Sequence, residues 1–298
     1  MMQTTGCAKW QAGGTIPPFT GNSPERIPLG QRSSNQNDSI CQVDLESILG
    51  DTFLESVRHY DQTDSTNTRA IELLATENSI QSPCLVYTES QAAGRGRGSN
   101  QWWSAAGSLT FSLIVDFRQI GFSAEQKPLL PLLTGMAIVR TGQSLLPDAD
   151  FALKWPNDVF LASRKLAGVL IEVPSQSSDH AVIGVGLNVN NSFSQAPDDL
   201  TSTGISLSDK SNMQHHRIDV IATLMREFES QINSFAAGQS FLDDWPNYCL
   251  LSGKQVTLQT GSTQVTGFCH GIDSNGALTL ETDNGRQSFF GGTVQTWT

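Results

Sequence analysis

The residues best suited to chemistry on a charged ligand are two arginines in a glycine-rich segment, GRGRG at residues 94–98. The glycines allow the backbone to approach a ligand closely, and Arg95 and Arg97 could each form charge-assisted bonds with a carboxylate or a phosphate. A solvated surface turn is the alternative, because short glycine motifs recur by chance. The segment fits neither GxGxxG nor GxxxxGK[ST], which argues against a dinucleotide-binding loop and a P-loop.

Further candidates follow along the chain. Lys154 begins the segment KWPND, and Lys165 lies in RKLAG at residues 164–168. A lysine among apolar residues is costly unless it is paired, so Lys154 either meets a partner or extends its ammonium to solvent. The adjacent Trp102 and Trp103 either wall a pocket or fill core volume. These residues predict a pocket for an anionic small molecule.

Cations are scarce in this chain. The 298 residues include 18 basic and 29 acidic side chains, for a net charge of −11. A field of this sign repels nucleic acids and anionic membranes, so we expect neither DNA nor a membrane as partner.

Five cysteines without a CxxC pair and five scattered histidines favour neither a disulfide framework nor a metal site. Without an apolar leader or membrane span, we expect a cytoplasmic protein.

The elements that must position these residues mix helices with strands. Asp64-Ser65-Thr66 is expected to cap a helix whose apolar residues lie on one face. Further helices are expected at 129–146 and 215–236, and strands at 84–88, 108–115, 151–155, 159–161, 166–173 and 181–189. Because strict βαβ alternation is missing, we predict an α+β domain with a mixed or antiparallel sheet.

Three regions are expected. Residues 1–54 are rich in Gly, Pro, Ser, Asn and Gln and predict a flexible, loosely attached N-terminal extension without a helix-turn-helix. Residues 55–248 would form the catalytic domain. In residues 249–298, short apolar runs are separated by Asn275-Gly276 and Asn284-Gly285, which are strong hairpin signals. This last region therefore predicts a small β-barrel.

Four motifs in order make the chain resemble the biotin protein ligases. They are DSTN at 64–67, GRGR at 94–97, KWPND at 154–158 and RKLAG at 164–168, with Gln91, Trp102 and GVGLNVN at 184–190. The similarity covers about residues 60–295. It implies a catalytic domain similar to class II aminoacyl-tRNA synthetases, followed by an SH3-like β-domain. One departure is that members of the family often continue GRGR as GRGRxGRxW, whereas GSNQ occupies residues 98–101 here.

The resemblance implies a reaction in two steps. Biotin and ATP, with Mg²⁺ accompanying the nucleotide, would form biotinyl-5′-adenylate and pyrophosphate. The biotinyl group would then pass to one lysine of the biotin carboxyl carrier protein of acetyl-CoA carboxylase. No metal ligand is expected among the side chains, and both a monomer and a homodimer remain open.

The resemblance also implies residue roles. Arg95, Arg97 and Lys154 would offset charge at the biotin carboxylate and the phosphate, with Lys154 bridging the two and Lys165 assisting the second step. The biotin-binding residues would be Ser65, Thr66, Asn67, Gln91, Gly94, Arg95, Gly96, Arg97, Trp102, Lys154, Gly168, Gly184 and Gly186. The ATP-binding residues would be Arg97, Trp103, Lys154, Asn157 and Asn188. Gly184 and Gly186 would let their strand approach biotin, Asn188 would read the adenine, and Asp158 is a candidate base.

Two other functions stay under consideration, beside the weaker alternative of an inactive binding module. A lipoate or octanoate ligase or transferase would share the fold, but the polar set Ser65, Thr66 and Gln91 suits the ureido ring of biotin better. A biotin-sensing repressor would need a DNA-binding domain, which the first fifty residues do not predict.

Overall fold

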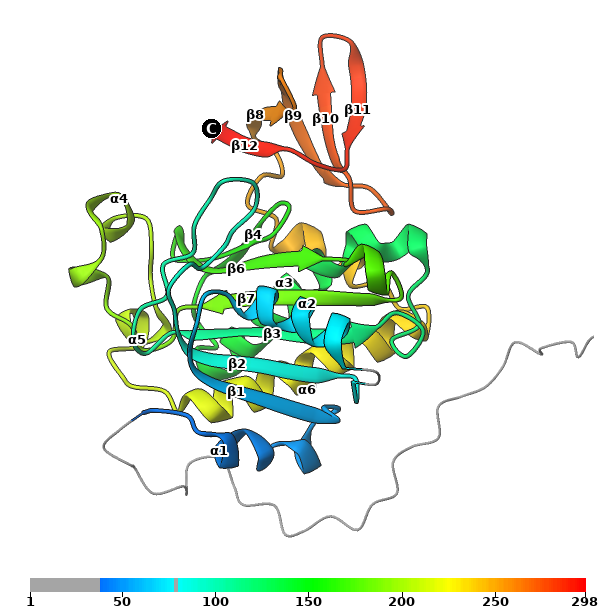
Figure 1. Cartoon of the computed structure of the whole chain (residues 1–298). Coiled ribbons are helices and arrows are strands. Elements are labelled where there is room, and N and C mark those ends of the chain that lie inside the picture. The colour runs from blue at the N-terminus through cyan, green and yellow to red at the C-terminus, as the bar shows by residue number, and fades with distance from the viewer. Residues whose placement is uncertain (1–37, 78–79) are drawn as a thin grey trace, which may run out of the picture. The chain divides into compact units, whose positions relative to one another are not determined.

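The computed structural model describes residues 38–77 and 80–298, and its larger sheet is mixed (Figure 1). Its seven strands run in the order β1-β2-β3-β7-β6-β5-β4. They are β1 (Ser56–Thr63), β2 (Cys84–Gln91), β3 (Leu109–Asp116), β4 (Phe151–Lys154), β5 (Asp158–Leu161), β6 (Arg164–Glu172) and β7 (His180–Leu187). β1 and β2 are parallel, and the other neighbouring strands are antiparallel. This confirms the predicted α+β class with a mixed sheet.

Helices cover both faces of this sheet. α2 (Thr66–Thr76) packs on one face, and α3 (Leu130–Leu145) and α6 (Arg217–Ala236) pack on the other (Figure 1). The short helices are α1 (Gln42–Glu46), α4 (Asp198–Thr201), α5 (Leu207–Ser211) and the 3-10 turns η1 (Leu49–Asp51), η2 (Ala124–Leu129), η3 (Ser175–Ser177), η4 (Phe193–Gln195), η5 (Phe241–Asp243) and η6 (Trp245–Asn247). Across the described residues, no helix has the length and apolarity needed to span a bilayer.

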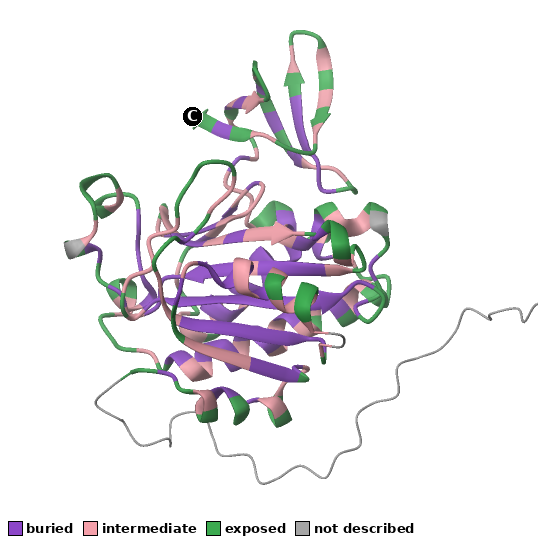
Figure 2. Ribbon diagram, viewed as in Figure 1, coloured by how far each residue is buried: buried purple, intermediate pink, exposed green. Residues whose placement is uncertain are grey.

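The central strands are buried on both faces, as Figure 2 shows in purple. Every residue of β3 is buried, because its alternate side chains face α2 on one side and α3 and α6 on the other. On the α2 side, Ala70 packs with Cys84, Val86, Ile114 and Val182. This double burial explains why the strand carries apolar residues on both faces, as Leu113 and Ile114 show.

The sequence predicted most of these elements within a few residues but missed β1. Its residues, SVRHYDQT, alternate poorly, and the strand lies at the edge of the sheet, where Asp61 and Gln62 are exposed. An edge strand with one solvated side loses the apolar pattern that identifies a central strand.

The described part of the expected N-terminal extension is packed, not loosely attached. Residues 38–54 include α1, and Ile40, Leu45, Ile48 and Leu54 are buried in the main core. Asp38 Oδ2 accepts a hydrogen bond from the buried Arg217 Nε at 2.8 Å. The rest of the expected extension, residues 1–37, lies outside the described residues, and the boundary at residue 54 stays a prediction.

A second sheet of five antiparallel strands follows, in the order β11-β10-β9-β8-β12. These are β8 (Gln255–Thr260), β9 (Thr263–Ile272), β10 (Leu278–Thr282), β11 (Gly285–Phe289) and β12 (Thr293–Trp297). Gly276 and Gly285 lie at the two predicted hairpin turns with φ of +79° and +88°. Trp155 Nε1 donates to Gly276 O at 3.0 Å, which connects the first turn to the residue that follows β4 of the larger sheet.

The packing of α1 predicts a stability effect. Leu45→Ala should lower the free energy of unfolding by about 2 to 5 kcal/mol, because Leu45 is fully buried. Val43 lies on the same helix with 71% of its surface exposed, so Val43→Ala should change it by less than about 0.5 kcal/mol. Urea unfolding of both variants tests this, and equal losses would contradict the packing of α1.

Candidate active site

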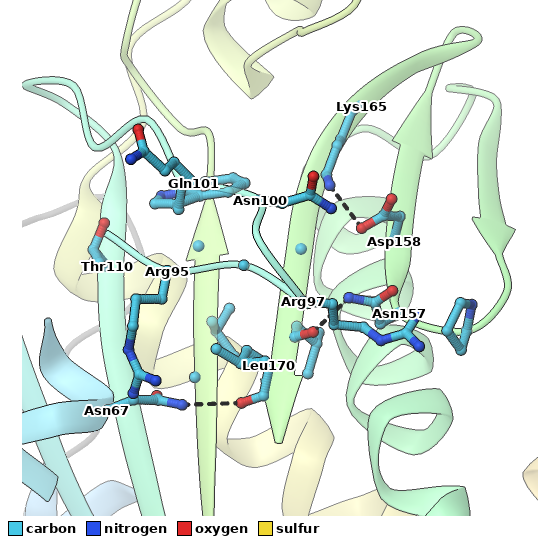
Figure 3. Close-up of a pocket in the computed structure, with 18 of the residues that line it drawn as sticks. Asn67, Arg95, Arg97, Asn100, Gln101, Thr110, Asn157, Asp158, Lys165 and Leu170 are labelled. Atoms are coloured by element: carbon cyan, nitrogen blue, oxygen red, sulfur yellow. Dashed lines mark hydrogen bonds and ion pairs between the residues drawn. The ribbon is translucent and has the colours of Figure 1, made fainter. Parts of the chain in front are cut away.

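One pocket brings together residues that are far apart in the sequence (Figure 3). All of the predicted biotin-binding residues except Gly94 line it, namely Ser65, Thr66, Asn67, Gln91, Arg95, Gly96, Arg97, Trp102, Lys154, Gly168, Gly184 and Gly186. Gly94 lies just behind, since a Cβ there would come within 2.8 Å of Gln91 Nε2. Asn157, Asp158 and Lys165 line the same pocket.

A second pocket adjoins the first and contains two of the residues expected to bind ATP, Trp103 and Asn188. Gln101, Trp102 and Lys165 line both pockets, so they form the boundary between them. Lys165 therefore lies where the two pockets meet, and Lys154 lines the first pocket. The bridging role expected for Lys154 stays a prediction.

A polar network connects α2, β2 and β3 at the floor of the first pocket. The backbone N and Oγ1 of Thr66 donate to Gln91 Oε1 at 2.8 and 3.2 Å. Ser112 Oγ lies 2.7 Å from Thr66 Oγ1 and 2.6 Å from Asn67 Oδ1. Ser65 occupies the N-cap position of α2, but its buried hydroxyl makes no cap bond. Ser112 was not predicted as a site residue, because the only indication in the sequence is a hydroxyl side chain in a largely apolar strand.

The amide of Asn67 is held by the protein. Its Nδ2 donates to Glu172 Oε2 at 2.7 Å and to Leu170 O at 3.3 Å, and its Oδ1 faces Ser112 Oγ. Both amide hydrogens are therefore engaged. In this arrangement Asn67 organises the pocket wall more than it offers donors to a ligand.

The side chains of the two arginines in the glycine loop point in different directions and bind different partners. Arg95 pairs with Glu172 through two bonds, Nη2–Oε2 at 2.7 Å and Nη1–Oε1 at 3.1 Å. Arg97 Nη1 donates to Gly292 O at 3.1 Å. Figure 3 shows Arg95 reaching toward Asn67 and Arg97 lying beside Asn157. The loop is thus attached to β6 on one side and to the turn before β12 on the other.

The glycine loop closes on itself with a tight turn. Gly96 N donates to Asn100 O at 2.8 Å, Asn100 N donates to Arg97 O at 3.2 Å, and Gly98 has a φ of +63°. Asn100 lines the first pocket, so a neutral amide stands at the position of the third arginine in the GRGRxGRxW pattern. The positive charge of the site therefore depends on fewer side chains.

Three cations gather at one end of the first pocket. Lys154 Nζ lies 4.2 Å from the centre of the Trp297 ring, and Lys165 Nζ lies 2.7 Å from Asp158 Oδ1. Burial lowers the pKa of Lys154, and the nearby Lys165 lowers it further, while Asp158 partly opposes both effects. Burial likewise lowers the pKa of Arg97. These groups are placed to receive an anion that offsets their mutual repulsion.

Gly184 and Gly186 make room for protein side chains. A Cβ at Gly184 would collide with the amide of Asn67, and one at Gly186 would collide with the indole of Trp102. We expected these glycines to let β7 approach the ligand directly. Both glycines line the pocket and also leave the space that Asn67 and Trp102 occupy, so they position these two side chains, and the expected approach of β7 to the ligand stays a prediction.

Comparison with known proteins identifies the family. The profile of the Biotin/lipoate A/B protein ligase family matches residues 60–188, and that of the Biotin protein ligase C terminal domain matches residues 251–297. The chain is 30% identical over 243 residues to the bifunctional ligase/repressor BirA of Bacillus spizizenii, covering 80% of this chain and 73% of the relative. It is 33% identical over 224 residues to the biotin--[acetyl-CoA-carboxylase] ligase of Mycobacterium tuberculosis, covering 74% and 81%.

The fold agrees with a solved structure, the biotin protein ligase of Aquifex aeolicus in complex with biotin and ATP. The TM-score is 0.70 at 24% identity, with 81% of this chain and 98% of that one covered. The chain thus has the fold of the biotin protein ligases, with a catalytic and a C-terminal domain that both match family profiles. It belongs to the biotin protein ligase family.

The role of Gly186 can be tested by adding one methyl group. Gly186→Ala should displace Trp102 from the boundary of the two pockets and weaken ligand binding about fivefold or more, if the about 1 to 3 kcal/mol that overpacking costs is lost from binding. Gly50→Ala is the control, because a Cβ there meets nothing within 4 Å. Isothermal titration with biotin measures both, after circular dichroism has established that each variant folds. Unchanged binding by Gly186→Ala would refute the role.

Proposed function

We propose that this chain is a biotin protein ligase that makes biotinyl-5′-adenylate from biotin and ATP and transfers biotin to a carrier lysine. The observation that carries the proposal is the first pocket, which has hydrogen-bonding groups at Thr66 and Gln91 and three cations at its other side. Trp103 and Asn188 in the adjoining pocket are suited to a purine. The two relatives named above as ligases support the same reaction.

The first step needs charge compensation more than proton transfer. An oxygen of the biotin carboxylate attacks the α-phosphorus of ATP, and the bond from that phosphorus to the bridging oxygen breaks, so pyrophosphate leaves. Both reactants are anions, and cations offset their repulsion. Lys165 lies where the two pockets meet, Lys154 and Arg97 lie beside it, and together they would hold the carboxylate next to the phosphate.

In the second step the neutral amine of the carrier lysine attacks the acyl carbon, and AMP leaves. A base must remove a proton from the nitrogen. Asp158 lines the pocket and lies next to Lys165, so we retain it as the proposed base. The carrier protein of acetyl-CoA carboxylase is the proposed acceptor, which the Mycobacterium tuberculosis relative's name supports.

Mg²⁺ is proposed to accompany the nucleotide. Among the described residues that line the two pockets, Asp158 is the one carboxylate, and the described chain has no cluster of three or more His, Cys, Asp or Glu side chains. Such a site fits a Mg²⁺ held largely by phosphates and water, with Asp158 as the available protein ligand. A bound Mg²⁺ would offset phosphate charge.

The lipoate ligase alternative shares the fold, but the hydroxyl of Thr66 and the amide of Gln91, which line the first pocket, suit a polar ring. We propose no repressor function, because that activity is part of the names of relatives such as the one from Bacillus spizizenii, and residues 1–37 lie outside the described part of this chain. A cytoplasmic site of action is in keeping with the free cysteines, Cys41, Cys84, Cys249 and Cys269.

The direct test uses purified protein with biotin, ATP, Mg²⁺ and an isolated carrier domain. We expect mass spectrometry to show one added biotinyl group on a single carrier lysine, and no addition when lipoate replaces biotin. A matched carrier in which that lysine is arginine is the control. Addition of lipoate in preference to biotin, or no addition at saturating substrates, would refute the proposal.

The buried lysine predicts a pH dependence. Because the pKa of Lys154 is lowered, its ammonium is fully present at low pH and is lost, as pH rises, earlier than that of an ordinary lysine. Pyrophosphate release should therefore fall on the alkaline side. In Lys154→Arg the guanidinium stays charged, so the residual activity should persist to higher pH. A wild-type and a variant profile with the same alkaline limb would contradict this role.

A further inference from the structure

Arg95 and the three clustered cations lie at opposite ends of the first pocket. In the register of the sheet, Asp158 pairs with Lys154 on β4 and with Gly168 on β6. Glu172, the partner of Arg95, is four residues beyond Gly168 on the same strand, which places it about 13 Å away at 3.3 Å per residue. A carboxylate held at the Asp158 end is therefore out of reach of a guanidinium held at Glu172.

The hydrogen-bonding groups for the ring of the acid lie on the Glu172 side. Asn67 contacts Glu172 directly, and it packs on Gly184, which pairs with Leu170 in the middle of β6. Ser112 links Asn67 to Thr66. The pocket thus has a ring end near Asn67 and an anion end near Lys165, and Arg95 belongs to the ring end.

Glu172 holds two pocket residues at once. Its carboxylate receives both Arg95 bonds, and Oε2 also accepts from Asn67 Nδ2 at 2.7 Å. Arg95 and Asn67 line the pocket, whereas Glu172 is not among the lining residues. The carboxylate therefore stands behind them, and the methylenes of Arg95 are left to face the ligand.

We propose that Glu172 is a positioning residue that holds the Arg95 side chain across the ring end of the pocket, so that Arg95 encloses the ring of the acid and does not bind its carboxylate. This rests on the proposed function and replaces the role expected for Arg95 from the sequence. Arg97, Lys154 and Lys165 are then the cations for the carboxylate. The Arg95 pair also ties the glycine loop to β6, which closes the pocket over the ring.

The test compares biotin with biotin methyl ester, which has the same ring but no negative charge. Dissociation constants are measured by isothermal titration for the whole chain and for Arg95→Met and Glu172→Gln. We expect each variant to weaken both ligands by the same factor, about threefold to tenfold, as for a partly exposed bidentate ion pair. Lys165→Met provides the opposite pattern, a larger loss for biotin than for the ester.

Two further measurements separate positioning from a general structural effect. The double variant should bind no more weakly than the weaker single variant, because each change breaks the Arg95–Glu172 contact and that contact can be lost only once. The KM for biotin should rise while kcat for pyrophosphate release at saturating biotin stays within about twofold. Arg118→Met, which breaks the exposed pair with Asp116, is the matched control and should change neither constant.

Three results would overturn the inference. Arg95→Met weakening biotin but not the ester would place Arg95 at the carboxylate. Unchanged dissociation constants for both ligands would show that the Arg95–Glu172 pair does not contribute to binding. If the double variant weakens binding by the product of the two single factors, the two residues act independently. Failure of the unaltered chain to bind biotin at all would instead refute the proposed function, so the two failures are distinguishable.

Discussion

The structure of the site depends on one electrostatic constraint, which is the presence of three cations in a partly buried pocket with one carboxylate among them. Asp158 pairs with Lys165, the ring of Trp297 faces Lys154, and the carbonyl of Gly292 receives Arg97. Each contact compensates part of a charge that burial would otherwise destabilise. Two of these three groups come from the C-terminal region, Trp297 from β12 and Gly292 from the turn before it. This region is therefore part of the site and not an appendage to it.

The fold was easier to predict from the sequence than the contacts within the site. β3, α3 and α6 carry apolar patterns that local sequence displays directly, so their existence could be inferred. Most pocket residues could be named because they lie in short motifs. The packed segment around Leu45 was missed because its low-complexity surroundings hid a single turn of amphipathic helix. No local pattern reports that Leu45 reaches the core.

The partners of the motif residues were beyond sequence reasoning. Glu172 lies 77 positions from Arg95, and Gly292 lies 195 positions from Arg97. A carboxylate at the end of a strand is most often a solvated edge residue, and a backbone carbonyl leaves no trace in the sequence. The packing role of the β7 glycines could not be predicted for a related reason. Their missing side chains suggested room for a ligand, but gave no sign that Asn67 and Trp102 also pack against them.

The two lysines of the site differ in the interaction that each loses when an anion binds. Lys154 rests on an aromatic ring and can approach a ligand without abandoning a charged partner. Lys165 is paired with Asp158, so a carboxylate or phosphate at the boundary of the pockets competes with Asp158 for its ammonium. In the proposed reaction, the adenylate would therefore draw Lys165 away and free an oxygen of Asp158. That oxygen would then serve as the proposed proton acceptor of the second step, which would link the charge compensation of the first step to the proton transfer of the second.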